Sequence, residues 1–112
     1  MSEEAEPVQG DFLNIEARQD RTGTTIAVEG EFDMMGTKRF WAFVSETLAT
    51  DPRSITVDAS GLEFIDSSGL MALMRARDAA AEAGVAFRVS NPSPALRRIA
   101  DACGLEDLLS DD

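Results

Sequence analysis

The sequence predicts a small α/β domain that begins with a β-hairpin and continues with alternating helices and strands. The stretch "TTIAVEGEF" alternates apolar and polar residues, which is typical of a half-buried strand. The run "SITVDAS" is short and β-branched, as in a strand buried on both faces. Helical spacing of apolar residues follows each of these strands, so we expect right-handed crossovers and mostly parallel later strands.

The first half of the domain is expected to form two strands and one helix. "DFLNIEARQD" and "TTIAVEGEF" pair as a hairpin with Gly23 in its turn. A helix is expected to open at Gly36 and Thr37 and to end at "DPR", because Pro52 disfavours the helical conformation in Asp51. Its buried face is predicted from spacings of three and four as Phe40, Phe43, Val44, Thr47 and Leu48.

The second half is expected to add two strands and two helices. "SITVDAS" forms a strand, "GLEF" links it to a helix over "SGLMALMRARDAAAEAG", and Gly84 is predicted as the C′ residue. The predicted inner stripe of that helix is Leu70, Leu73, Met74, Arg77 and Ala81. "VAFRVS" is a further strand, and the last helix has Ser93 as N-cap, Pro94 at its first position and Gly104 as its stop.

The 112 residues suit a single domain. Residues 1–10 are predicted to be a disordered acidic tail, residues 11–109 the domain, and residues 110–112 a frayed acidic terminus. The chain has neither a secretion leader nor an apolar run of membrane-spanning length, and its single cysteine suits a reducing compartment. We therefore expect a cytoplasmic protein, with Cys103 as a small buried residue near a helix end.

Ten Lys and Arg against 21 Asp and Glu give a net charge of −11. Such a surface repels phosphate backbones and anionic lipid, so nucleic-acid and membrane binding are not expected. The charge favours a partner with a basic surface, or serves only solubility, and the composition leaves both open. The chain has no His and no Tyr, which removes the commonest general base and metal ligand, so we expect no enzyme.

The segment "FIDSSGL" is the main functional candidate. It lies where the chain leaves a strand and enters a helix, and Asp66 or Ser67 is suited to cap that helix. A second interpretation is that one of these serines accepts a phosphoryl group. A phosphate would meet the positive end of the helix dipole, and its charge of about −2 beside Asp66 would change binding without refolding. The spacing alone leaves both interpretations open.

Three segments in register resemble the STAS domain family, specifically the bacterial anti-sigma factor antagonists. They are "SITVDASGLEFIDSSGLMALM", "VEGEFD" and "NPSPALRRIADACGLEDLL", and the resemblance covers about residues 11–109. It implies a mixed central sheet with helices packed mainly on one face. It also implies partner switching, in which the unphosphorylated protein binds an anti-sigma factor that is itself a serine kinase and so releases the sigma factor.

The resemblance assigns roles to individual residues. Ser67 would be the phosphorylated serine, and a metal-dependent serine phosphatase would restore the binding form. ATP belongs to the kinase, so no cofactor, metal or catalytic residue is implied in this chain. The implied partner-binding residues are Asp33, Asp66, Ser68, Gly69 and Met71. Gly69 would let the partner's backbone approach closely, and Met71, off the apolar stripe, would give adaptable contact.

Two other functions are considered. A phospho-aspartate receiver needs a strand-end Asp, an acidic pair for Mg²⁺ and a lysine near the phosphate. Asp58 could be the first, but Asp33 stands alone and Lys38 lies early in a helix, so the set is incomplete. STAS-like modules also serve in stress-signalling scaffolds and as accessory subunits of membrane transporters, and fold alone does not separate these roles.

Overall fold

The computed structural model describes residues 12–109. The predicted tail at 1–10 and terminus at 110–112 therefore lie outside the described residues. The chain forms β1 (Leu13–Asp20), β2 (Gly23–Phe32), α1 (Met34–Ala49), β3 (Ser54–Ile65), α2 (Ser67–Glu82), β4 (Ala86–Ser90), α3 (Pro94–Ala102) and the 3₁₀ turn η1 (Glu106–Leu108). The predicted order of strands and helices is confirmed.

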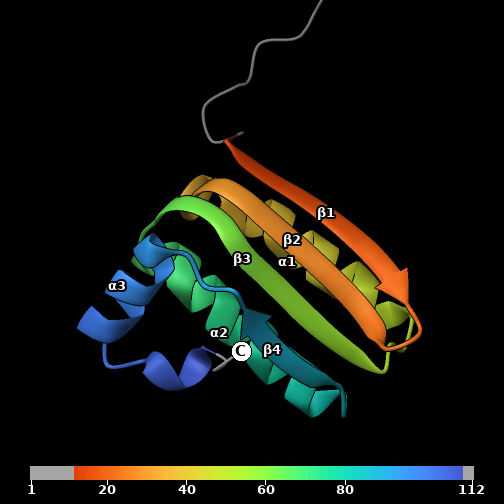
Figure 1. The fold of residues 1–112 in the computed structure, drawn as a ribbon. Helices are drawn as coiled ribbons and strands as arrows, with labels where there is room; N and C mark the ends of the chain where they lie inside the picture. The colour runs from red at the N-terminus through yellow and green to blue at the C-terminus, as the bar shows by residue number, and fades with distance from the viewer. Residues whose placement is uncertain (1–11, 110–112) are drawn as a thin grey trace, which may run out of the picture.

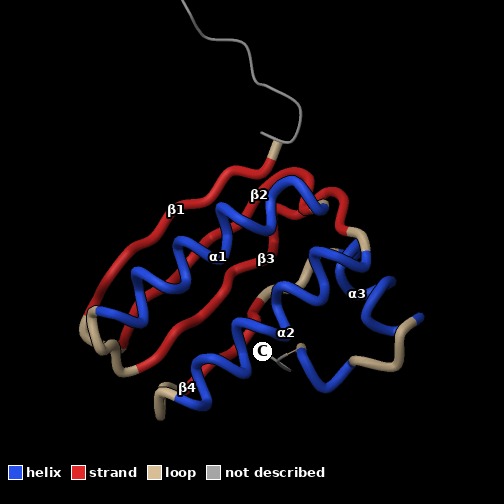
Figure 2. Tube along the Cα trace, turned by 180° about the vertical axis from the view of Figure 1, so that it is seen from behind, coloured by secondary structure: helices blue, strands red, loops and turns tan. Residues whose placement is uncertain are grey.

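The four strands of the described chain form one sheet in the order β1-β2-β3-β4. β1 and β2 are antiparallel, whereas β2–β3 and β3–β4 are parallel, so the sheet is mixed. Helices α1 and α2 lie side by side behind the sheet in Figure 1 and in front of it in Figure 2. α3 packs against β3 and α2. The predicted α/β class, with an N-terminal hairpin and helices mainly on one face, is confirmed.

The core lies between the sheet and the two long helices. β2 and the first half of β3 alternate buried and less buried residues, and the helices contribute one face each, as the apolar periodicities predict. Phe32 and Phe40 are the largest fully buried side chains, and their rings pack at 5.1 Å between centroids. In α2 the buried residues are Gly69, Leu70, Leu73, Ala76 and Ala80, so Arg77 and Ala81, predicted on the inner stripe, lie one step off it.

The hairpin turn is fixed by a side chain. The Asp20 carboxylate accepts hydrogen bonds from the backbone N–H and hydroxyl of Thr22 and from the N–H of Gly23. These bonds, first that of the Thr22 hydroxyl, hold the pKa of the Asp20 carboxyl below its ordinary value. Gly23, with φ of 149°, starts β2 at a conformation that other residues rarely adopt, which confirms its predicted place in the turn.

Two boundaries differ from the sequence prediction. α1 begins at Met34, two residues before the expected Gly36, because the Asp33 side chain accepts from the Met35 N–H and caps the helix there. "GLEF" is the continuation of β3, so the expected link does not exist. The segment lacks regular alternation because the pairing with β2 shifts register twice, between Ala27 and Glu29 and between Gly30 and Glu31.

The ends of α2 and α3 follow the prediction. Gly84 and Gly104 have φ of 73° and 69° directly after their helices, and Ser93 caps α3 by accepting from the Leu96 N–H. Cys103, however, is exposed, which contradicts the expected burial. Cys103 is the C-cap of α3, and its side chain is exposed to water at this end of the helix.

Candidate functional site

The candidate site lies at one end of the sheet, where β2 and β3 pass into helices. Phe32 and Ile65 pair across these strands, so Asp33 and Asp66 follow at neighbouring positions, and each caps a helix. In Figure 1 the two strands turn back here into α1 and α2. The Asp66 N–H also donates to the Phe32 carbonyl oxygen at 3.2 Å, which ties the two strand ends together.

Asp33–Gly36 and Asp66–Gly69 are similar helix starts, although the Asp33 carboxylate accepts from the Met35 N–H and the Asp66 carboxylate from the Gly69 N–H. In each, an aspartate is the N-cap and a glycine is the third helical residue. The sequence prediction missed this correspondence, although the repeated pattern Asp-x-x-Gly is visible in the sequence. The two caps differ in what stands at the first and second helical positions, which are Met34 and Met35 in one helix and two serines in the other.

The two serines have different environments. The Ser68 hydroxyl donates to the Asp66 carboxylate at 2.6 Å and is half-buried, whereas Ser67, the first residue of α2, is exposed. Within residues 12–109 the Ser67 side chain makes no hydrogen bond, and the backbone N–H groups of both serines donate to no acceptor. Asp66 thus performs the capping, and the Ser67 hydroxyl is accessible to an enzyme.

Gly69 has a role inside the fold. It is buried, and a Cβ there would lie 2.5 Å from the Phe32 carbonyl oxygen and 2.9 Å from Cγ1 of Ile65. The close approach that only glycine permits is therefore made by the chain's own β2, and a partner's backbone has no access to this position. Gly69 therefore serves the packing of α2 on the sheet and is not proposed as a partner contact.

A hollow of about 440 Å³ adjoins the serines between α1 and α2. Its lining is mainly apolar and consists of Thr37, Ser68, Met71, Ala72, Met74, Arg75 and Asp78. Met71 is 59% exposed, as expected of a residue off the apolar stripe. The Arg75 guanidinium lies over the half-buried ring of Trp41, 4.7 Å from its centroid, which closes one wall of the hollow.

Asp58 does not form a receiver site. β3 continues for seven residues beyond it, and its carboxylate accepts from the Ser60 N–H at the irregular step in pairing with β2. It alternates with the buried Val57 and Ala59 and so faces the side of the sheet away from the helices. Among residues 12–109 no three Asp, Glu, Cys or His side chains gather as metal ligands. This geometry disfavours the receiver alternative.

Asp66 is expected to stabilise the start of α2 through its capping hydrogen bonds. Asp66→Ala removes the acceptor for the Gly69 N–H and for the Ser68 hydroxyl, so we expect it to lower the free energy of unfolding by about 1 kcal/mol. Urea unfolding followed by circular dichroism measures this loss. Asp33→Ala, which removes the equivalent cap of α1, is the matched variant and should cost a similar amount. An unchanged midpoint for Asp66→Ala would contradict the capping role.

The fold and this site define a small α/β domain that presents one free hydroxyl at a helix N-terminus. A family model described as "Mlab, STAS domain" matches residues 15–110. A STAS-domain containing protein of Pseudomonas aeruginosa (strain UCBPP-PA14) is 32% identical over 84 residues, which cover 75% of this chain and 82% of that protein. The chain belongs to the STAS domain family.

Solved structures agree on the fold. An anti-sigma factor antagonist from Mycobacterium paratuberculosis is 24% identical, with a TM-score of 0.76 over 87% of this chain and 82% of that one. The anti-sigma factor antagonist SpoIIAA in its unphosphorylated form is also 24% identical, with a TM-score of 0.68 and 88% of each chain covered. Phosphorylated SpoIIAA from Bacillus is 22% identical, with a TM-score of 0.69 over 88% and 91%.

Proposed function

We propose that this protein is an anti-sigma factor antagonist that works by partner switching. Its unphosphorylated form binds an anti-sigma factor with serine-kinase activity and so releases a sigma factor, and phosphorylation of Ser67 abolishes that binding. The observation that carries the proposal is the difference between the serines: Ser67 is exposed with no hydrogen bond from its side chain in the described chain, whereas Ser68 is held by Asp66. ATP and its metal belong to the kinase, and a metal-dependent serine phosphatase reverses the modification.

The fold is suited to carry a phosphate on Ser67. The first-turn N–H groups of α2 and the positive end of the helix dipole favour an anion there, by about 0.3–1 kcal/mol at an exposed site. The solved structures of SpoIIAA support this reasoning, because its unphosphorylated and phosphorylated forms resemble this chain equally well, with TM-scores of 0.68 and 0.69. Both forms of SpoIIAA thus keep the fold that this chain resembles, which supports the proposal that phosphorylation acts on binding and leaves the scaffold in place.

A closely packed partner is sensitive to the same phosphate. The modification adds a charge of about −1.5 to −2 next to the Asp66 carboxylate. Burying such a group against another protein carries a desolvation cost of several kcal/mol unless it is paired. The contact surface around Ser67 is proposed to include Asp33, Asp66, Ser68 and Met71, with the hollow between α1 and α2 beside them. No direct contact with nucleic acid or membrane is proposed, in keeping with the net charge of −11.

The residue that is modified can be identified directly. The protein is incubated with a candidate anti-sigma factor kinase and ATP, and the product is mapped by mass spectrometry. We expect one phosphate on Ser67, none on Ser67→Ala, and modification of Ser68→Ala at Ser67, because Ser68 is engaged with Asp66. A phosphate on Ser68, or on neither serine, would contradict the proposed acceptor.

The cytoplasm is the proposed location, since the kinase and the sigma factor act there. Within the described chain no helix is long and apolar enough to cross a membrane.

A different role inside the family has one observation in its favour. The fold also matches a part of the much longer SLC26A9 chain, with a TM-score of 0.63, and this chain covers only 16% of it. A STAS domain can thus be one module of a larger assembly, such as a stress-signalling scaffold or a transporter. A permease gene beside this one, with no anti-sigma kinase gene, would favour the accessory role.

A further inference from the structure

The large apolar side chains that the described residues expose all lie at the Ser67 end of the molecule. Met34 and Met35 open α1, Met71 follows the serines in α2, Phe64 is the penultimate residue of β3, and Phe12 precedes β1. Their exposed fractions range from 44% for Phe12 to 68% for Met34. We call these five residues the apolar rim.

The rim continues around the edge of the sheet, away from the helices. The Glu31 N–H donates to the Phe12 carbonyl oxygen, and Glu31 pairs with Phe64 across the β2–β3 ladder. Both phenylalanines therefore stand beside Glu31. Leu13 and Phe32, the next residues along these strands, are buried against the helices, so Phe12 and Glu31 face the other side.

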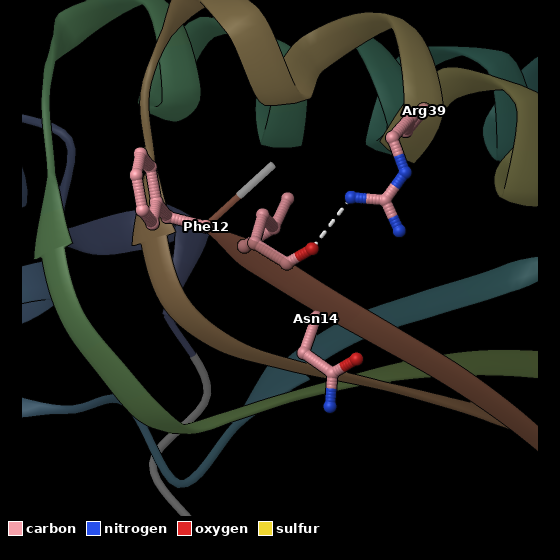
Figure 3. A pocket seen from close by; sticks show the side chains of 4 residues that line it. Phe12, Asn14 and Arg39 are labelled. Carbon is pink, nitrogen blue, oxygen red and sulfur yellow. Dashed lines mark hydrogen bonds between the residues drawn. The ribbon is translucent and has the colours of Figure 1, made fainter. Parts of the chain in front are cut away.

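Figure 3 shows the Phe12 ring at the start of β1, turned away from the Arg39 guanidinium, although both residues line the same hollow. Arg39 reaches from α1 to the Leu13 carbonyl oxygen at 2.6 Å and lies on the helix side, in a hollow of about 460 Å³. Phe64 alternates with the buried Ile65 and so faces away from the helices, whereas Ser67, three residues later, is the first residue of α2. Phe12 and Phe64 form a sheet-side half of the rim.

The same end is rich in acids, although Arg39 adjoins Phe12 and Arg75 adjoins Met71 in the two hollows. Residues 29–35 and 60–71, which carry most of the rim, contain five acids and no Lys or Arg, so all ten basic residues of the chain lie elsewhere in the sequence. A second copy of this chain would meet its own acids across such a surface, and anionic lipid would be repelled. Apolar side chains bordered by carboxylates are complementary to an apolar protein surface bordered by Lys and Arg.

We infer that the apolar rim is the docking surface for the anti-sigma factor, and that its sheet-side half anchors the complex apart from Ser67. This inference rests on the proposed function and adds the chemistry of the partner: an apolar patch flanked by cationic side chains. Phe64 provides the apolar contact, and Glu31 and Glu63 provide the charge. Because Ser67 lies on the helix side, the anchor and the phosphorylation switch are separate parts of one interface.

Two variants test the anchor. Phe64→Thr keeps a strand-forming residue and removes an exposed ring, and Phe87→Thr, which removes a half-buried ring from β4 at the opposite end of the sheet, is its control once its fold is verified. The double charge reversal of Glu31 and Glu63 to Lys is matched by the same change at Glu46 and Glu82, which are exposed on α1 and α2 away from the rim. Affinity for the anti-sigma factor is measured at low and high salt, and circular dichroism confirms folding.

We expect Phe64→Thr and the Glu31/Glu63 reversal each to weaken binding at least about tenfold, while both controls stay within about threefold of the unchanged protein. The reversal should also flatten the salt dependence of the affinity. Wild-type affinity in both rim variants, with loss of binding on Ser67 phosphorylation, would overturn the inference and leave the proposed function intact. No binding by the unmodified protein or by Ser67→Ala would remove the proposed function, and the inference with it.

Discussion

Phosphorylation of Ser67 is expected to weaken binding to the anti-sigma factor about a thousandfold, which corresponds to about 4 kcal/mol. The physical reason is the burial of a near-dianion against a packed partner beside the Asp66 carboxylate. Ser67→Ala removes only an exposed hydroxyl and should bind like the unmodified protein, whatever the activity of the kinase. Ser67→Glu carries a single charge on a shorter side chain, so we expect a smaller loss of at least about tenfold.

Isothermal titration calorimetry measures the affinity for the anti-sigma factor of the unmodified protein, of Ser67→Ala, of Ser67→Glu and of the phosphorylated form. Ala42→Glu is a suitable control, because it places the same single charge at an exposed position in the middle of α1. This variant should bind normally, which would attribute the effect to the position of the charge and not to the net charge of the protein. Equal affinity of Ser67→Ala, Ser67→Glu and the phosphorylated form would contradict the switch.

The regular parts of the fold follow from local pattern. The hairpin, the parallel strands and three helices could be predicted because apolar periods of two and of three to four residues persist over long stretches, for example in α1. The start of α2 could also be predicted, because Asp and Ser are favoured where a helix leaves its first N–H groups unpaired.

The two misplaced boundaries have different causes, a strand irregularity in β3 and a side-chain cap in α1. "GLEF" lacks alternation because β3 is bulged where the Asp58 carboxylate binds the Ser60 N–H, and a bulge has no period that a sequence pattern can reveal. The sequence prediction opens the first helix at Gly36 and Thr37, just before its apolar spacing begins. The capping of the helix by Asp33 shows instead that this glycine stands inside the first turn.

The sequence predicts where the candidate site lies along the chain, but not how its side chains are arranged. The sequence places Ser67 and Ser68 next to each other with the same chemistry, and only the structure distinguishes the exposed hydroxyl from the one that Asp66 engages. The exposed phenylalanines at the ends of β1 and β3 could not be found either. Phe12 and Phe64 are far apart in the sequence, and only the pairing of both strands with β2 brings them beside Glu31.

Gly69→Ala is expected to destabilise the fold by about 2 kcal/mol, because an added Cβ has no room beside the backbone of β2. The Phe32 carbonyl oxygen, 2.5 Å from that Cβ position, also accepts the Asp66 N–H, so α2 cannot move away without weakening the bond that joins the two strand ends. For a domain of about this size, such a loss lowers the melting temperature by about 10 °C.

Gly36→Ala is the matched control, since Gly36 is the third residue of α1 just as Gly69 is of α2. Both changes gain the same helix propensity of about 1 kcal/mol, so the difference between them isolates the contact. At Gly36 the nearest atoms to the new Cβ are Cδ2 and Cβ of Leu13, at 3.0 and 3.3 Å, which are side-chain atoms and not backbone, so the melting temperature should change less than for Gly69→Ala. Equal melting temperatures for the two variants would mean that α2 can shift freely over β2, and the Ser67 hydroxyl would then lack the fixed position that a docking partner requires.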